Sequence, residues 1–373
     1  MTASIALIGA NGHGAWHRRR IAALGARVRL VGLADPQPLS PPGPAGVPVF
    51  PDHRAMLAAT GPDVVVICTP PHTHLPLALD AIEAGCDILL EKPPVASLAA
   101  HRTLTAALSA AGLACQVGFQ ALASAAWASF RQALPSVRPA GITAAASWKR
   151  DDDYYARAPW AGRRVLDGRA VIDGSLVNPL AHAVMQALAS ASAAGAGRPR
   201  QLTVERYRTR PIEADDTAFA RITFDGGLNL VVAVTLAGED FIPGEIAVAG
   251  PGGRAVLEYP TDRILLPGSP TMSEIPGRTD LLTNLLDHRR AGTPLLVPLS
   301  VTADFTMVLE ALTAPDMPDP RLLSPPVVQI DGPNRTITGV NEVIRKATAE
   351  MRLPSELGVP WAVPPTTRRL PAS

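Results

Sequence analysis

The chain has 373 residues, of which 47% are hydrophobic and 18% are charged. This apolar content allows a sizeable core and excludes wholesale disorder, and the length favours two domains over one. Its 34 Lys and Arg residues nearly balance its 33 Asp and Glu residues, giving a net charge of +1. We therefore expect neither a nucleic-acid partner nor a membrane partner.

The cysteines are few and are not arranged as metal ligands. Cys68, Cys86 and Cys115 form no C-x-x-C motif and no Cys/His cluster with metal-ligand spacing, so no metal site is expected. Met1 leads directly into a strand-like run, without a basic leader, and no apolar stretch is long enough to span a bilayer. These features together predict a cytoplasmic protein in a reducing compartment.

Short apolar runs alternate with helical patterns over the first third of the chain. The runs predict strands at 4–8, 28–34, 64–68, 87–90 and 114–119, and the patterns predict helices at 15–24, 75–84 and 98–111. Strands and helices that alternate at this spacing favour an α/β fold with a doubly wound parallel sheet. We assign residues 1–122 to such a Rossmann domain.

The pattern changes after Ser124, where longer strands are joined by turns. Strands are predicted at 142–148, 201–208, 218–224 and 228–236, and Asp225-Gly226-Gly227 is a hairpin signal. Helical patterns at 180–188, 281–290, 302–312 and 341–351 would cover one face of this sheet. We therefore predict that residues 123–373 form an α+β domain with a large open, mostly antiparallel sheet. Its free face predicts a homodimer or homotetramer.

A glycine-rich turn lies between the first predicted strand and helix. It reads Gly9-Ala10-Asn11-Gly12-His13-Gly14, and it departs from G-x-G-x-x-G only at Asn11, a residue that tolerates left-handed backbone. Backbone N–H groups at the start of a helix can hold a pyrophosphate. We therefore predict that Gly9, Asn11, Gly12, His13 and Gly14 bind a dinucleotide. The alternative is a glycine turn in a fold that has no cofactor.

An acidic residue ends the second predicted strand. Asp35 lies 21 residues after Gly14, where a carboxylate can accept hydrogen bonds from the adenosine ribose and repel a 2′-phosphate. This position favours NAD over NADP, with NADP left possible.

Two further motifs end predicted strands, V-V-I-C-T-P-P-H-T-H at 65–74 and L-L-E-K-P-P at 89–94. The carboxyl edge of a parallel sheet is where ligands bind, so Lys92 is well placed to meet a substrate. The alternative is a surface lysine paired with Glu91.

These motifs resemble those of the Gfo/Idh/MocA oxidoreductases, named for glucose-fructose oxidoreductase and inositol dehydrogenase. The resemblance implies a nicotinamide dinucleotide on the first domain, Lys92 beside its nicotinamide, and a sugar, cyclitol or related substrate between the domains. Gln120 resembles the family's polar position near the nicotinamide, although the arginine often found just beyond it is absent. The cofactor contacts that the resemblance implies are Thr69, Pro70, His74, Glu91 and Gln120.

The family's second domain usually contributes a D-x-G-x-H helix start, and Asn178-Pro179-Leu180-Ala181-His182 resembles it. The histidine is kept, while Asn178 replaces the carboxylate and Leu180 replaces the glycine. Because an amide cannot take a proton at neutral pH, His182 is the predicted catalytic base and Asn178 is a predicted substrate contact. The alternative for His182 is a structural histidine at the start of an apolar helix.

Polar and aromatic residues are concentrated between 148 and 173, just before His182. In a chain with only 4% aromatic residues, this cluster is typical of a surface that stacks on and hydrogen-bonds a polyol. Within it we predict that Lys149, Tyr154 and Arg163 contact the substrate. The alternative is a solvated insertion.

The sequence thus predicts an oxidoreductase that transfers a hydride between a nicotinamide cofactor and a secondary alcohol or ketone of a sugar, cyclitol or derivative. Lys92 and His182 are its predicted catalytic residues, with His182 moving the hydroxyl proton and Lys92 stabilising the alkoxide. Two alternatives remain: a redox-assisted lyase or glycosidase that recycles its cofactor, and a regulatory protein that senses the dinucleotide without turnover.

Overall fold

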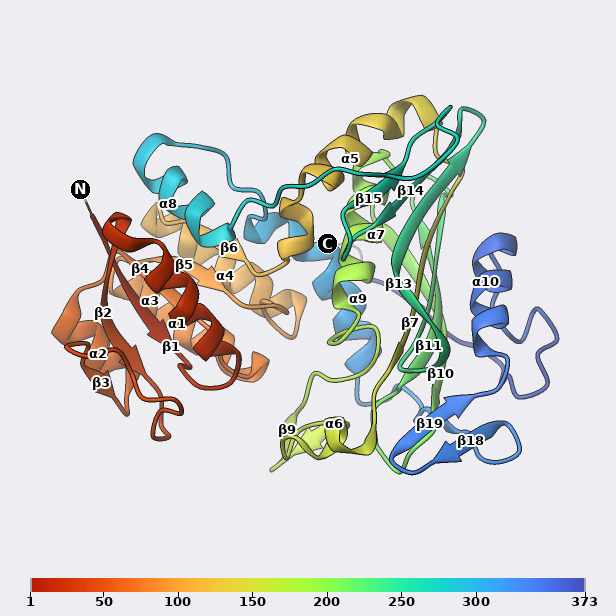
Figure 1. Cartoon of the computed structure of the whole chain (residues 1–373), viewed down its shortest axis with the longest axis horizontal. Coiled ribbons are helices and arrows are strands. Elements are labelled where there is room, and N and C mark those ends of the chain that lie inside the picture. Colours follow the sequence, from red (N-terminus) through yellow and green to blue (C-terminus); the bar gives the residue numbers. More distant parts are fainter. Residues whose placement is uncertain (1, 372–373) are drawn as a thin grey trace. The chain divides into compact units, whose positions relative to one another are not determined.

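The computed structural model describes residues 2–371, and of Arg169 and Ala170 it describes the backbone alone. The chain forms two compact units (Figure 1). Unit 1 contains the residues up to Gln120 together with Thr279–Thr306, and unit 2 contains Ala121–Arg278 and the residues from Met307 onward. The sequence predicted that 123–373 form one continuous domain, whereas in the structure residues 279–306 are part of unit 1.

Unit 1 is built on a six-stranded parallel sheet in the order β3-β2-β1-β4-β5-β6. This order confirms the predicted doubly wound sheet. The strands β4 and β5 are buried along their whole length, as strands covered by helices on both faces must be. The strands are β1 (Ala3–Ile8), β2 (Val28–Ala34), β3 (Val49–Phe50), β4 (Val64–Ile67), β5 (Asp87–Leu90) and β6 (Cys115–Val117).

The helices between these strands have well-formed ends. In α2 the Asp52 side chain accepts from the N–H of Ala55, and in α4 Ser97 accepts from Ala100, so each helix begins with a side-chain cap. Gly61 and Gly112 end the same helices in left-handed backbone. The helices are α1 (His13–Ala23), α2 (His53–Thr60), α3 (His74–Glu83) and α4 (Leu98–Ala111), with short 3-10 turns η1 (Gly25–Arg27) and η2 (Pro71–Thr73).

The segment 279–306, which belongs to unit 1, contains α8 (Leu281–Ala291), η4 (Leu299–Thr302) and the start of α9 (Ala303–Thr313). The buried amide of Gln116 on β6 donates to Asn284 Oδ1 and accepts from the N–H of Val297 at 2.9 Å. Arg289 on α8 donates to Asp63 at 2.7 Å and to Asp87 at 2.9 Å. Because its polar contacts join it to the parallel sheet, α8 does not cover the second sheet as predicted.

Unit 2 contains a ten-stranded mixed sheet in the order β16-β15-β14-β13-β7-β12-β11-β10-β17, with β20 also paired to β10. Only β7 with β12 and β10 with β17 run parallel, which confirms the mostly antiparallel prediction. The predicted hairpin turn at 225–227 joins β11 to β12, and Gly227 has the positive φ of +79° that this turn needs. The strands are β7 (Gly141–Lys149), β10 (Pro199–Arg208), β11 (Thr217–Phe224), β12 (Asn229–Thr235), β13 (Ala237–Gly250), β14 (Gly253–Glu258), β15 (Arg263–Leu265), β16 (Ser273–Glu274), β17 (Arg321–Leu322) and β20 (Thr366–Arg369).

Helices pack against both faces of this second sheet (Figure 1). α5 (Ala125–Val137) and α7 (Ala181–Ala193) lie on one side, and α10 (Val340–Glu350) lies on the other, so the predicted one-sided cover is wrong. Beneath α10 a second core gathers Tyr207 and Phe219 from the sheet, Ile344 from the helix and Trp361 from the C-terminal segment. An amphipathic pattern identifies the buried side of a helix but not which face of which sheet it covers.

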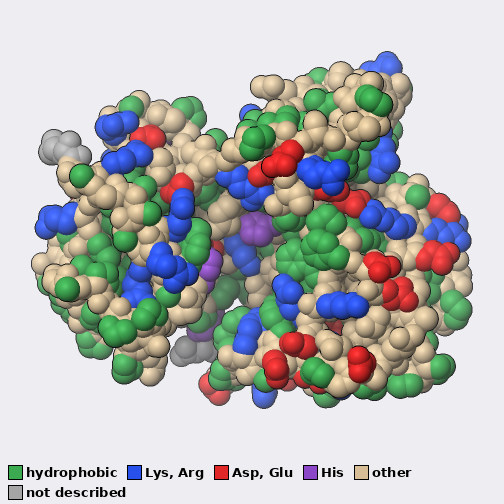
Figure 2. Space-filling model, viewed as in Figure 1, with side chains coloured by type: hydrophobic (Ala, Val, Ile, Leu, Met, Phe, Trp, Pro, Cys, Tyr) green, Lys and Arg blue, Asp and Glu red, His purple; other side chains and the backbone are tan. Residues whose placement is uncertain are grey.

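The remaining short elements are η3 (Gln120–Ala123), α6 (Asp152–Ala156) and the hairpins β8 (Val165–Leu166) with β9 (Arg169–Ala170) and β18 (Val328–Asp331) with β19 (Asn334–Ile337). Across residues 2–371, every helix is too short or too polar to cross a bilayer. On the face seen in Figure 2, acidic and basic side chains are interspersed over both units.

Candidate functional site

The glycine turn passes very close to neighbouring backbone. Gly9 follows β1 with a φ of +82°, and a Cβ at this position would lie 2.2 Å from the carbonyl oxygen of Cys68. A Cβ on Gly14 would lie 1.9 Å from the carbonyl oxygen of Gly9. Real Cβ atoms do not approach backbone this closely, so both positions require glycine.

The start of α1 is open and has no side-chain cap. Gly12 is its N-cap residue with a φ of +52°, and nothing lies within 4 Å of the position its Cβ would take. Uncapped N–H groups and the positive end of the helix dipole suit an anion, and the missing side chain lets a ligand approach the backbone. The turn therefore fits the diphosphate of a dinucleotide.

Asp35 organises this turn as well as ending β2. Its Oδ2 accepts from the N–H of Ala10 at 2.9 Å and of Asn11 at 3.0 Å, and its Oδ1 accepts from the N–H of Gln37 at 3.0 Å. A carboxylate oxygen has two lone pairs, so these contacts leave one on Oδ1 for a ligand hydroxyl. The negative charge disfavours a phosphate at the same place.

Asn11, the departure from the glycine pattern, holds the loop that follows β2. Its Oδ1 accepts from the N–H of Ser40 at 2.9 Å, and its Nδ2 donates to the carbonyl of Pro38 at 3.2 Å. A glycine would leave this loop without either bond, so the amide side chain has a structural role here.

Glu91 is a buried carboxylate that ends β5. Its Oε1 lies 2.9 Å from Nε2 of His17 and 3.5 Å from Nε2 of His13, and its Oε2 accepts from the N–H of Lys92 at 3.1 Å. Burial alone would raise the pKa of Glu91, but the hydrogen bonds from the two histidines outweigh it and hold the pKa well below its usual range. The carboxylate thus joins α1 to the loop that carries half-buried Lys92.

His74 also contacts this loop, through the carbonyl group of Pro93. The ring of His74 is fully buried, with Nδ1 2.9 Å from the carbonyl oxygen of Pro93 and Nε2 2.8 Å from that of Thr69. It therefore links the loops after β4 and β5 from within the protein. The Thr69 hydroxyl is hydrogen-bonded to Thr73 at 2.7 Å, exposed Pro70 precedes η2, and half-buried Gln120 begins η3.

In unit 2, Asn178 is held by a carboxylate that the sequence motif did not reveal. Its Nδ2 donates to Oδ1 of buried Asp173 at 3.0 Å, while Oδ2 of Asp173 accepts from the N–H of Gly162 at 2.7 Å. Half-buried His182 lies in the first turn of α7, with its ring 6.1 Å from that of Tyr259. A carboxylate is therefore kept next to position 178, five residues earlier in the chain.

Two arginines of the polar loop before α7 contact Tyr154. Half-buried Tyr154 has the guanidinium carbons of Arg157 at 3.6 Å and Arg150 at 5.1 Å from its ring centre, which are cation–π contacts. Lys149, at the end of β7, and Arg163 are both exposed. The structure thus surrounds Tyr154 with arginines and leaves Lys149 and Arg163 facing solvent.

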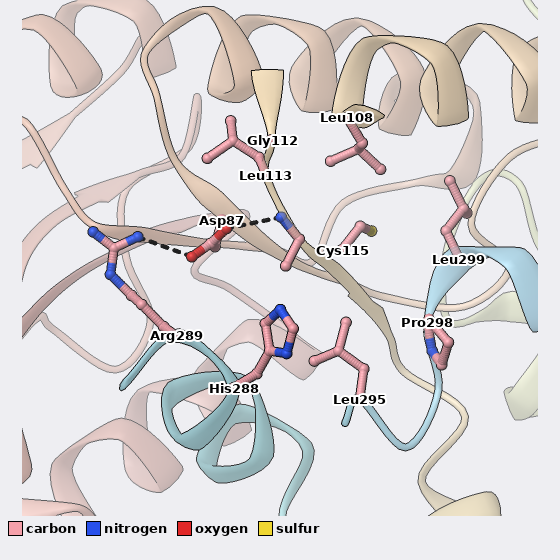
Figure 3. A pocket seen from close by; sticks show the side chains of 11 residues that line it. Asp87, Leu108, Gly112, Leu113, Cys115, His288, Arg289, Leu295, Pro298 and Leu299 are labelled. Carbon is pink, nitrogen blue, oxygen red and sulfur yellow. Dashed lines mark hydrogen bonds and ion pairs between the residues drawn. The ribbon is translucent and has the colours of Figure 1, made fainter. Parts of the chain in front are cut away.

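Unit 1 contains a cavity of about 510 Å³ (Figure 3). It is lined by Asp87 at the start of β5 and Cys115 at the start of β6, with His288 and Arg289 from α8. This is the amino edge of the sheet, opposite the edge at which open α/β sheets bind ligands. Burial raises the pKa of the Cys115 thiol to about 12, so it is no nucleophile at neutral pH.

The strand order, the glycine turn at the first strand end and the acidic end of β2 define a Rossmann nucleotide-binding domain. Residues 3–119 match the model of the Gfo/Idh/MocA family, described as an oxidoreductase family with an NAD-binding Rossmann fold. The resemblance predicted from the motifs is thereby confirmed over residues 3–119.

Two curated proteins are similar over parts of the chain. A D-glucoside 3-dehydrogenase of Escherichia coli is 50% identical over 46 residues, and inositol 2-dehydrogenase 4 of Saccharopolyspora erythraea is 35% identical over 120 residues. The matches cover 12% and 31% of this chain, and only 13% and 36% of those relatives' lengths.

Solved structures share the fold over most of the chain. The WlbA dehydrogenase of Bordetella pertussis, in complex with NADH and UDP-GlcNAcA, is 21% identical with a TM-score of 0.71, covering 87% of this chain and 100% of its own. UDP-N-acetylglucosamine 3-dehydrogenase GnnA of Acidithiobacillus ferrooxidans is 18% identical with a TM-score of 0.64, covering 84% and 99%. Both units therefore follow one known architecture.

Proposed function

We propose that this chain is an NAD-dependent oxidoreductase that acts on a secondary alcohol or ketone of a sugar, cyclitol or derivative. One observation carries the proposal: the glycine turn after β1 and the Glu91-Lys92 pair after β5 lie at the same edge of one parallel sheet, with β4 between the two strands. That edge is where doubly wound sheets bind dinucleotides. Relatives named as glucoside and inositol dehydrogenases support the substrate class.

The backbone of the turn, from Gly9 through Gly14, would hold the diphosphate against the start of α1, and Asp35 would accept the ribose hydroxyl. Two similar proteins are described in complex with NADH or NAD, which supports this choice of dinucleotide. Asp35→Asn tests it, because the neutral side chain no longer repels a 2′-phosphate. We expect the ratio of NADPH to NADH affinity to rise by about tenfold, or 1.4 kcal/mol.

When bound, a nicotinamide dinucleotide supplies or accepts the hydride. The Lys92 ammonium, half-buried behind Glu91, would stabilise the negative charge that develops on the substrate oxygen. His182 would take or return the hydroxyl proton as general base and acid. Asp173 would fix the Asn178 amide so that its oxygen orients a substrate hydroxyl, a positioning role rather than a catalytic one.

Binding is tested by titrating the protein, freed of retained dinucleotide, with NADH and separately with NADPH. Nicotinamide fluorescence and energy transfer from Trp16, half-buried on α1, report binding. We expect tight NADH and weak NADPH binding. Preference for NADPH would contradict the role of Asp35, and a folded protein that binds neither would refute the proposal.

Turnover is tested with a panel of sugars, cyclitols and nucleotide sugars while NADH formation is followed. Lys92→Met should lower kcat by about 10²–10⁴-fold, whereas Lys346→Met, which removes an exposed lysine on α10, should leave it unchanged. If product accumulates without net NADH, the redox-assisted lyase or glycosidase replaces the dehydrogenase. Bound NADH without turnover of any substrate favours the regulatory alternative.

We also propose that the chain assembles as a homodimer or homotetramer. Light scattering at micromolar concentration tests this, and a monomeric mass would contradict it.

A further inference from the structure

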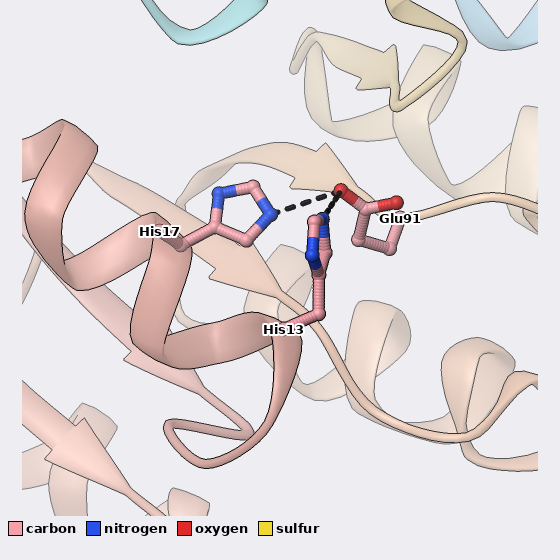
Figure 4. Close-up of side chains that lie close together, drawn as sticks. All are labelled: His13, His17 and Glu91. Atoms are coloured by element: carbon pink, nitrogen blue, oxygen red, sulfur yellow. Dashed lines mark hydrogen bonds and ion pairs between the residues drawn. The ribbon is translucent and has the colours of Figure 1, made fainter. Parts of the chain in front are cut away.

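Three metal-ligating side chains meet beside the glycine turn (Figure 4). His13 and His17 are four residues apart on α1, so both imidazoles lie on one face of the helix, and Glu91 faces them from the end of β5. Their ligand atoms all lie within 4.8 Å of one another. The prediction that no metal site is present considered only clusters that contain cysteine, so it did not identify this pair of histidines.

The distances suit a small ion. A tetrahedral zinc ion holds nitrogen and oxygen ligands at about 2.0–2.2 Å, which places any two of them about 3.3 Å apart. Glu91 Oε1 lies 2.9 Å from Nε2 of His17 and 3.5 Å from Nε2 of His13. Small rotations of the three side chains would therefore admit an ion between them without movement of the backbone.

The environment also favours a cation. Glu91 is buried and held as a carboxylate, and its Oε1 faces imidazole nitrogens, which coordinate metals in their neutral form. The His13 side chain is 55% exposed, which gives an ion access from solvent and leaves a coordination position for water. Two imidazoles and a carboxylate suit zinc, iron, cobalt or nickel better than magnesium or calcium.

We propose that His13, His17 and Glu91 form a binding site for a divalent transition-metal ion in the dinucleotide-free protein. The site stands on its own geometry and does not depend on the proposed oxidoreductase activity. Two of its three protein ligands lie on the first turns of α1 and the third follows β5, and the site is open to solvent at His13.

Equilibrium dialysis of metal-stripped, dinucleotide-free protein against Zn²⁺ tests the stoichiometry. We expect one ion per chain, with His13→Ala weakening the affinity by about a hundredfold or more because it removes a ligand. His13 is exposed, so this variant keeps the fold even if the buried His17→Asn variant does not. His288→Ala removes a histidine of α8 outside the cluster and serves as the matched control.

A spectroscopic readout locates the ion. The His13 ring stacks on Trp16 at 5.2 Å with an interplanar angle of 7°, and the other four tryptophans belong to unit 2. Co²⁺ or Ni²⁺ at the site should therefore quench Trp16, and His13→Ala should abolish the saturable part of that quenching.

Metal binding that His13→Ala leaves unchanged, or no saturable binding at all, overturns the proposal. One ion lost with His13→Ala and kept with His288→Ala supports it. Because the assay contains no dinucleotide, NADH binding is scored separately: a protein that binds NADH but no Zn²⁺ refutes only this site, and the converse refutes only the oxidoreductase.

Discussion

The two units position their candidate residues in different ways. In unit 1 backbone constraints set the geometry: Gly9 and Gly14 touch neighbouring carbonyl groups, and Asp35 binds the turn through two peptide N–H groups. In unit 2, Tyr154 and Asn178 are held mainly by other side chains. A site fixed by backbone tolerates little substitution, whereas a loop held by side chains can vary its contacts at low cost. The comparison therefore predicts that substitutions are tolerated less well at the glycine turn of unit 1 than around Tyr154 and Asn178 of unit 2.

The largest effect is expected at Gly9. Gly9→Ala combines a φ of +82° with a Cβ 2.2 Å from a backbone carbonyl, and should cost about 3 kcal/mol or more in the free energy of unfolding and abolish NADH binding. Gly85→Ala is the matched control, because its φ is +78° and nothing lies within 4 Å of the added Cβ. It should cost about 1 kcal/mol. Urea unfolding measures both free energies. Equal costs for the two variants would show that the close approach of Gly9 to the Cys68 carbonyl group adds no destabilisation.

Glu91 should make unit 1 sensitive to acid. Its folded pKa lies below the ordinary unfolded value of about 4.3, so its contribution to stability is present above that pH and is lost as the pH falls. Glu91→Gln should cost about 1–3 kcal/mol at pH 7 and flatten the stability profile between pH 5 and 3. Exposed Glu83→Gln is the control. Thermal unfolding across this range measures the effect, and parallel profiles for wild type and Glu91→Gln would contradict it.

Asp173→Asn tests whether unit 2 also contains a rigid support. The amide can replace only one of the two acceptor oxygens that bind Asn178 and Gly162, so stability should fall by about 1–2 kcal/mol. If Asp173 positions Asn178 for substrate, KM should rise more than in Asp153→Asn, a variant at an exposed residue of the same loop. An unchanged KM would leave Asp173 with a purely structural role.

The smallest effect on stability is expected at Tyr154. Tyr154→Phe keeps the ring beneath Arg157, so the free energy of unfolding should change by less than about 0.5 kcal/mol. A rise in KM at unchanged stability would support the hydroxyl as a substrate contact. An unchanged KM would remove it from the substrate site and weaken the contrast between the units.

Sequence reasoning succeeded where local rules dictate structure. Alternating strands and helices, the glycine turn and the Asp-Gly-Gly hairpin each follow from backbone geometry over a few residues. The departure at Asn11 is compatible with the turn because the amide bonds the loop at Pro38 and Ser40, a role that only tertiary structure reveals.

Other features depend on contacts between residues distant in the chain. The helical pattern at 281–290 gave no indication that Arg289 would bind Asp63 and Asp87 of the first sheet. Nor could spacing reveal that Asp173 supports Asn178, since the family's motif has its carboxylate at position 178 itself. The candidate substrate contacts Lys149 and Arg163 remain predictions.

Because residues 279–306 belong to unit 1, this unit depends on a segment that the ribosome synthesises late. Gln116 finds its partners Asn284 and Val297 only after that segment has been translated, so unit 1 cannot be completed when residue 120 emerges. At about 5–20 residues per second, the delay is about 10–40 seconds. Throughout this interval the nascent chain exposes the β6 side of its sheet, where Gln116 has no partner from residues 279–306.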